Sequence, residues 1–177
     1  IGEYHSGGRV ENGSSILTSK EAVYYADLKD VYFKQNVHLK DPKYKLDTDS
    51  LLYNTQTEIA TFIAQTSIED SAKRKVRTRE GFYDLKNKKA IFTSRTVIED
   101  GSVKVIGNNI TRDDSTGISK VEGNAVYTDT AQGIAVLAGR MLTNSKEGSF
   151  LATLHPLMII KQEEDSIYIT ADTLFSG

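Results

Sequence analysis

The stretch Leu46-Asp47-Thr48-Asp49-Ser50-Leu51-Leu52-Tyr53 decides the fold, because variants of it recur along the chain. Its apolar and small positions are matched 29 residues earlier by Leu17, Ser19, Ala22 and Tyr24, and 30 residues later by Val76, Thr78, Gly81 and Tyr83. Each copy continues with an aliphatic-x-Phe element and closes on an aliphatic-x-Asp element. A fixed period of this length is the signature of a repeat architecture.

The repeats predict one domain over residues 1–177. Five copies fall roughly at 16–41, 44–70, 74–100, 103–129 and 134–160, and a partial copy occupies 167–177. The last copy is incomplete and apolar, with Ile169 and Phe175 near its end. We therefore expect the chain to be a fragment of a longer protein.

Within each copy the hydrophobic pattern is that of a β-strand. Val31 and Phe33, and likewise Val103 and Val105, alternate with polar residues at period 2, and no segment shows sustained helical periodicity. Polar turn sequences such as 54–57 fall at about half the repeat, which predicts a strand, a turn and a return strand. The sequence thus predicts an all-β fold of antiparallel hairpins.

A change of parity predicts that the long strands are creased. Leu46 and Thr48 share one face, but Leu51 and Tyr53 have the opposite parity, so a bulge near Asp49-Ser50 is needed to keep both pairs on one face. Stacked creased strands would form a folded sheet with an apolar concave face. The residues we assign to that face as lipid-groove candidates are Val31, Phe33, Val37, Leu39, Leu46, Leu51, Tyr53, Ala60, Phe62, Ile68, Val76, Phe92, Ile98 (or its neighbour Val97), Val105, Ile110 and Val121.

That concave face has two interpretations. Its residues could pack against each other in an ordinary closed core, which is what apolar alternation commonly indicates. Alternatively, the crease could hold the two halves of the sheet apart and admit acyl chains, since medium-sized aliphatic residues suit a smooth apolar trough.

Composition excludes several classes of function. The chain has no cysteine and a formal net charge of −2, so thiolate chemistry and general attraction to nucleic acid are not expected. The three histidines are far apart, and most paired acids lie in turns, where Asp side chains bond the local backbone. We expect no catalytic residues, no metal site and no cofactor.

One basic cluster stands out at residues 73–79. Arg74, Lys75, Arg77 and Arg79 are candidates for contacting anionic head groups at the rim of the groove, because arginine binds phosphate in bidentate geometry. Alternation places Arg77 and Arg79 on the other face of the strand from Val76 and Thr78. This favours a solvated outer face for these two arginines.

Several of these segments resemble a known family. The region from Ala26-Asp27-Leu28-Lys29-Asp30-Val31-Tyr32-Phe33 to Asn54, together with Gly123-Asn124-Ala125-Val126-Tyr127 and Ile169-Thr170-Ala171-Asp172-Thr173-Leu174, is similar to OstA-like proteins, in particular to those of Bacteroidetes-type bacteria. These are relatives of the LptA-type proteins of lipopolysaccharide transport. The resemblance covers nearly the whole chain, but residues 131–164 are longer and less regular.

The resemblance implies a β-jellyroll, or β-taco, whose V-shaped groove holds the acyl chains of lipid A. It also implies a periplasmic protein, with any leader outside this chain, that bridges toward the outer membrane. Partners would be lipopolysaccharide or a similar lipid and other jellyroll domains joined by end-to-end strand addition, with homo-oligomers possible through exposed edge strands. The alternative is a structural β-solenoid or adhesin-like protein with a closed core and no lipid ligand. A polysaccharide-active β-helix enzyme is less consistent with the sequence, which lacks a cluster of acids and bases on one outer face.

Overall fold

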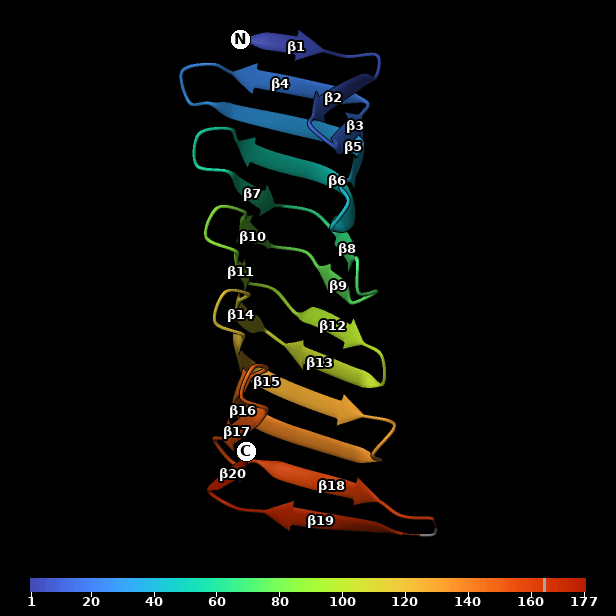
Figure 1. Ribbon diagram of the computed structural model, residues 1–177, viewed down its shortest axis with the longest axis vertical. Helices are drawn as coiled ribbons and strands as arrows, with labels where there is room; N and C mark the ends of the chain where they lie inside the picture. Colours follow the sequence, from blue (N-terminus) through green and yellow to red (C-terminus); the bar gives the residue numbers. More distant parts are fainter. Residues whose placement is uncertain (164) are drawn as a thin grey trace. The chain divides into compact units, whose positions relative to one another are not determined.

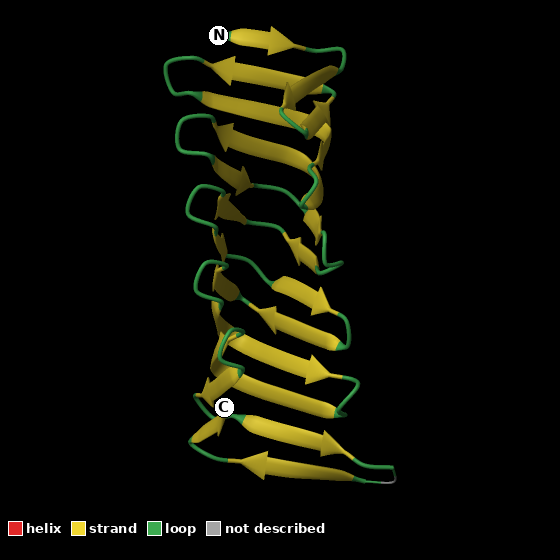
Figure 2. Ribbon diagram, in the orientation of Figure 1, coloured by secondary structure: helices red, strands yellow, loops and turns green. Residues whose placement is uncertain are grey.

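The computed structural model of the chain describes residues 1–163 and 165–177, and these residues form strands and turns without a helix (Figures 1 and 2). Every strand pair whose register is defined is antiparallel, so the predicted all-β antiparallel class is confirmed. The described residues include no helix long and apolar enough to cross a membrane.

The strands are β1 (Gly2–Tyr4), β2 (Gly8–Asn12), β3 (Ser15–Ser19), β4 (Glu21–Tyr25), β5 (Asp30–Lys40), β6 (Tyr44–Asn54), β7 (Ile59–Phe62), β8 (Thr66–Asp70), β9 (Lys75–Thr78), β10 (Gly81–Asp84), β11 (Lys89–Phe92), β12 (Thr96–Asp100), β13 (Val103–Gly107), β14 (Asn109–Asp113), β15 (Ile118–Asp129), β16 (Ile134–Asn144), β17 (Ser149–Thr153), β18 (Leu157–Lys161), β19 (Ser166–Thr170) and β20 (Thr173–Ser176).

The chain divides into two compact units, Ile1–Lys88 and Lys89–Gly177. Unit 1 consists of two arms that share the long strands β5 and β6. Arm A has the order β1-β4-β5-β6-β7-β10, and arm B has the order β2-β3-β5-β6-β8-β9. Hydrogen bonding therefore continues from one arm into the other through the two long strands.

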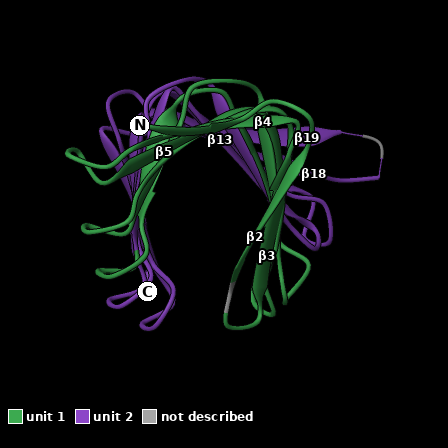
Figure 3. Ribbon diagram, turned by 90° about the horizontal axis from the view of Figure 1, so that it is seen from above, with its two compact units in different colours: residues 1–88 green, residues 89–177 purple. Residues whose placement is uncertain are grey.

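Unit 2 repeats this plan with β15 and β16 as its shared strands. Its arm A has the order β11-β14-β15-β16-β17-β20, and its arm B has the order β12-β13-β15-β16-β18-β19. Seen from above, the strands of each unit follow a curved path (Figure 3). A folded sheet of two arms in each unit is consistent with a β-jellyroll or β-taco.

A bulge forms the crease between the two arms of unit 1. The register of β5 against β6 shifts between Lys34 and Val37, so Gln35 and Asn36 together lie opposite Asp49. Both bulge residues have positive φ, a conformation that asparagine tolerates better than most residues. The predicted crease is thus present beside Asp49, but the additional residue is in the partner strand β5.

Unit 2 is creased in the same way. The register of β15 against β16 shifts between Glu122 and Ala125, where Gly123 and Asn124 have positive φ. A comparable left-handed pair, Leu154 and His155, separates β17 from β18, and Pro156 follows it in a fully buried position. Pro156 therefore lies at a bend and interrupts no strand, as expected for a residue without an amide proton.

The hairpin turns recur with the period of the sequence repeat. The residue that ends each turn of arm A is left-handed, and these residues are Lys29, Glu58, Lys88, Gly117 and Gly148, spaced by 29 to 31 positions. Neighbouring turns within a unit are hydrogen-bonded: the amide of Thr55 donates to the carbonyl of Lys29 at 2.8 Å, and that of Ser145 to Gly117 at 3.0 Å. The exact repeat boundaries stay a prediction.

Candidate functional site

In each unit, the groove candidates lie on one face of that unit's folded sheet, which we call its inner face. They occupy six ladders of residues that are directly opposite one another on adjacent strands. In unit 1 the ladders are Val31–Tyr53–Ala60, Phe33–Leu51–Phe62, Val37 with Thr48, Thr66 and Thr78, and Leu39–Leu46–Ile68–Val76. In unit 2 they are Phe92–Ile110–Val121 and Ile98–Val105.

Burial is most complete at the crease and lower at many positions further out, although Leu46 and Val136, one ladder out on arm B, are still buried at 4% and 2% exposure. Next to the crease, Phe62 is 2% exposed and Val37 is fully buried. One ladder further out on arm A, Val31, Tyr53 and Ala60 are only half-buried. The inner side chains are therefore packed tightly at the crease and partly accessible toward the rims.

Hydroxyl groups line the crease of unit 1. Thr48 and Thr66 are opposite each other and buried, and the hydroxyl of Thr66 donates to Oγ1 of Thr48 at 2.9 Å. Each crease hydroxyl also contacts a backbone carbonyl two residues away, as Thr78 does with Glu80 at 3.3 Å and Ser19 with Glu21 at 2.9 Å. These contacts satisfy carbonyls where the strand bends away from its ladder.

Aromatic side chains lie on the inner face of each unit, and in unit 2 one pair of them spans the two arms. In unit 2 the ring of Tyr127 on arm B lies 5.5 Å from that of Phe150 on arm A. In unit 1, burial raises the pKa of Tyr44 to about 12, and the nearby charges of Asp41, Tyr83 and Tyr53 add to the shift.

The four basic candidates do not share a face. Arg74 has the parity of Val76 and lies on the inner side of the rim of arm B, where its Nη2 is 2.7 Å from Oδ2 of Asp70. Lys75 and Arg77 lie opposite Glu69 and Ser67 on the outer face and are exposed. Arg79 follows the end of β9 and is also exposed. The structure does not bring the four together into one cationic site.

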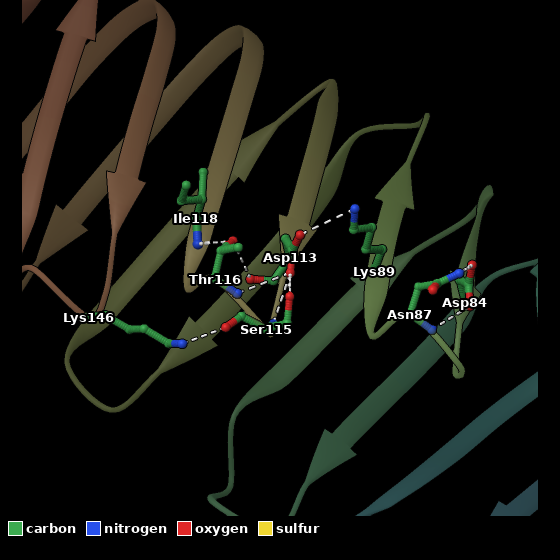
Figure 4. Close-up of polar contacts among 8 residues, drawn as sticks. All are labelled: Asp84, Asn87, Lys89, Asp113, Ser115, Thr116, Ile118 and Lys146. Carbon is green, nitrogen blue, oxygen red and sulfur yellow. Dashed lines mark hydrogen bonds and ion pairs between the residues drawn. The ribbon is translucent and has the colours of Figure 1, made fainter.

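The acids at the turns serve the local backbone. In Figure 4, Oδ1 of Asp113 accepts hydrogen bonds from the amides of Ser115 at 2.9 Å and Thr116 at 3.1 Å. The hydroxyl of Ser115 donates to the same oxygen and lowers the pKa of Asp113 to about 2. Asn87 likewise lowers the pKa of Asp84 by hydrogen bonding (Figure 4). Among the described residues, no group of three or more His, Asp or Glu could hold a metal ion.

Sequence reasoning missed several inner-face residues. Tyr83 lies opposite Ala60, and Met141 lies opposite Val121 and is 1% exposed. Tyr44 precedes Leu46 by two positions, and Arg112 follows Ile110 by two. The same alternation that selected their neighbours could have identified Tyr44 and Arg112.

Fold and inner face define the class: an all-β protein of creased antiparallel hairpins with an apolar inner face. The family model described as OstA-like protein matches residues 1–49, which span β1 to β5 and the first part of β6. This match confirms the resemblance to OstA-like proteins over that stretch. No curated protein matches the chain.

Proposed function

We propose that the chain is a periplasmic scaffold that holds the acyl chains of lipopolysaccharide on its inner face during transport to the outer membrane. The observation that carries this proposal is the gradient of burial along the inner face. An apolar surface that is packed at the crease and accessible toward the rims can accept hydrocarbon without first unfolding. The match to an OstA-like protein over residues 1–49 supports the same interpretation.

The proposal divides the groove candidates into two groups. The buried residues would form the floor of the groove and set the angle between the arms. The partly exposed residues would contact the acyl chains, and they are Val31, Leu39, Tyr53, Ala60, Ile68, Val76 and Val105. Of the basic candidates, Arg74 fits a head-group contact best, since it alone has the inner parity at a rim.

Exposed apolar side chains on the last strands support end-to-end association as the way in which the scaffold bridges. At the C-terminal end, β19 and β20 carry the exposed side chains Ile167, Tyr168 and Phe175. Unpaired backbone groups at such an edge are a template for adding a strand. Another jellyroll domain, or a second copy of the chain, would extend the sheet there.

A second candidate function is a structural scaffold with a closed core and no lipid ligand. The specific observation in its favour is the contact between Tyr127 and Phe150. These two rings, 5.5 Å apart, join the two arms of unit 2 across its inner face. In this alternative the half-buried residues near the rims are the margin of an ordinary core.

Photo-crosslinking with purified lipopolysaccharide distinguishes the two functions. A benzophenone amino acid at Leu39 or Tyr53 would probe the inner face, and the adjacent outward positions His38 and Leu52 serve as matched controls. Adducts at the inner positions only are expected if the inner face holds lipid. If a folded protein gives no adduct at either inner position, the lipid function is wrong and the closed scaffold is favoured.

A further inference from the structure

Unit 2 carries a positive charge within an inner-face ladder that is otherwise uncharged. Arg112 on β14 follows the buried Ile110 by two positions and therefore shares its face. It lies between Ala90 on β11 and Ser119 on β15, and Thr143 on β16 is opposite Ser119. The corresponding ladder of unit 1 is formed by Tyr24, Val31, Tyr53, Ala60 and Tyr83, without a basic residue.

The guanidinium of Arg112 is held in place along one edge only. Its Nε is 2.5 Å from Oδ1 of Asp114, two residues further along the chain. Within residues 1–163 and 165–177, its Nη1 and Nη2 have no protein partner, and neither do the hydroxyls of Ser119 and Thr143. Because no buried side-chain nitrogen or oxygen of the described residues lacks a partner, these donors must be accessible to solvent or to a ligand.

These donors suit a phosphate group. Arginine binds phosphate through two parallel N–H donors, and hydroxyls on adjacent strands add further hydrogen bonds. The side chain of Arg112 is only 26% exposed, so water screens its charge less than at an open surface. Asp114 orients the guanidinium through Nε and also offsets part of its charge, so a bound phosphate would have to approach from the Nη edge, away from this carboxylate.

Hydrocarbon contacts are available next to these donors. Phe150 on β17 is opposite Thr143 in the same ladder, and its ring contacts Tyr127 on arm B. An anionic group at Arg112 would therefore lie beside an aromatic surface that can contact an alkyl chain. This combination matches an amphiphile that carries its phosphate close to its hydrocarbon.

We infer that unit 2 binds the phosphate of an anionic amphiphile through Arg112, Ser119 and Thr143, with its hydrocarbon against Phe150 and Tyr127. This inference rests on the proposed function, because it assumes that the inner face holds a lipid. It adds that the ligand is selected for a phosphate, and that the selecting residue lies in unit 2, outside the basic cluster at residues 73–79.

The test measures binding of dodecyl phosphate, dodecanol and inorganic phosphate by calorimetry below micelle-forming concentrations. Arg112→Gln is compared with the wild type and with Arg140→Gln, which removes an exposed cation from the outer face of the same unit. Loss of a charge-assisted contact is expected to weaken dodecyl phosphate about tenfold or more, with dodecanol unchanged. Arg140→Gln should bind both amphiphiles as the wild type does, and Arg112→Lys should give an intermediate affinity for dodecyl phosphate.

The other outcomes separate this inference from the proposed function. If both amphiphiles bind and Arg112→Gln changes neither, the phosphate site is wrong while the lipid function stands. If inorganic phosphate binds as tightly as dodecyl phosphate, the residues form a free-anion site and not a lipid site. If neither amphiphile binds to folded protein, the lipid function fails and this inference fails with it. Circular dichroism of each variant establishes that it is folded.

Discussion

The crease and the rims of the inner face contain the same kinds of side chain in different surroundings. Phe62 and Leu51 at the crease are almost completely buried, whereas Leu39 and Tyr53 are only half-buried. Burial of apolar area stabilises the fold in proportion to the area removed from water, so a fully buried side chain at the crease contributes more than a half-buried one of the same kind. Surface that remains accessible toward the rims is available for a ligand. Under the proposed function, one hydrophobic pattern would supply stability near the bend and binding further from it.

The largest effect should come from emptying a position at the crease. Phe62→Ala removes a side chain that is 2% exposed and leaves a cavity between Leu51 and Gly81. The free energy of unfolding should fall by about 3–5 kcal/mol. Urea denaturation followed by circular dichroism measures it. A loss below about 1 kcal/mol would mean that the crease is loosely packed and would remove the contrast with the rims.

A smaller effect is expected from the buried hydroxyl at the crease. Thr66→Val keeps the shape of the side chain but removes the hydroxyl that contacts Oγ1 of Thr48 and the carbonyl of Ala64. Leaving buried polar groups unpaired should cost about 2 kcal/mol. The control is Ser67→Val on the adjacent, exposed position, which should change stability much less. Equal effects of the two variants would show that the hydroxyl ladder does not support the bend.

Toward the rim, the balance between stability and binding should reverse. Leu39→Ala removes a half-buried side chain and should destabilise the fold by only about 1 kcal/mol. Under the proposed function it should also reduce lipid crosslinking at Tyr53, because both positions would line the same groove. A stability loss as large as that of Phe62→Ala would instead place Leu39 in a closed core.

The smallest effect concerns pH and the tyrosine on the rim of arm B. The pKa of Tyr44 is about 12 in the folded chain and about 10 when unfolded, so folding favours its neutral form. This contribution is complete below about pH 10 and is lost as pH rises through 12. Tyr44→Phe should therefore lose less stability than the wild type between these values. Urea denaturation at pH 9.5 and pH 11.5 measures the free energy of unfolding of both proteins. If it falls equally in the wild type and in Tyr44→Phe between these two pH values, Tyr44 is solvated in the folded chain.

Periodicity was sufficient to predict which residues of β5, β6 and β7 share a face. Alternation within β5, β6 and β7 correctly placed Phe33, Leu51 and Phe62 together, because side chains on a strand have a period of 2 and repeats stack in register. The parity change in Leu46-Asp47-Thr48-Asp49-Ser50-Leu51 located the crease to within a residue. It did not show which strand contains the bulge, since nothing in the polar run Lys34-Gln35-Asn36 distinguishes the two left-handed residues from ordinary strand residues.

Proximity across the inner face could not be predicted from the pattern. Tyr44 and Tyr53 are nine positions apart on β6, on opposite sides of its bend, yet Tyr53 is among the lesser causes that raise the pKa of Tyr44. The pairing of Tyr127 with Phe150 depends on the same bend in unit 2. An alternation pattern assigns a face to each residue but contains no information on the angle between arms. That angle determines how much of the inner face a ligand can reach.

Successive turns are joined by the same kind of hydrogen bond, so each sequence repeat adds a fixed length to the fold. Thr55 to Lys29 and Ser145 to Gly117 join each turn to the one before, so adding a copy requires no new kind of contact. Each copy contributes two strands, and strands are about 4.8 Å apart, so one more copy lengthens a unit by roughly 10 Å. The length of such a unit therefore depends on its number of repeats. Duplication or deletion of a whole repeat would change that length by a fixed amount.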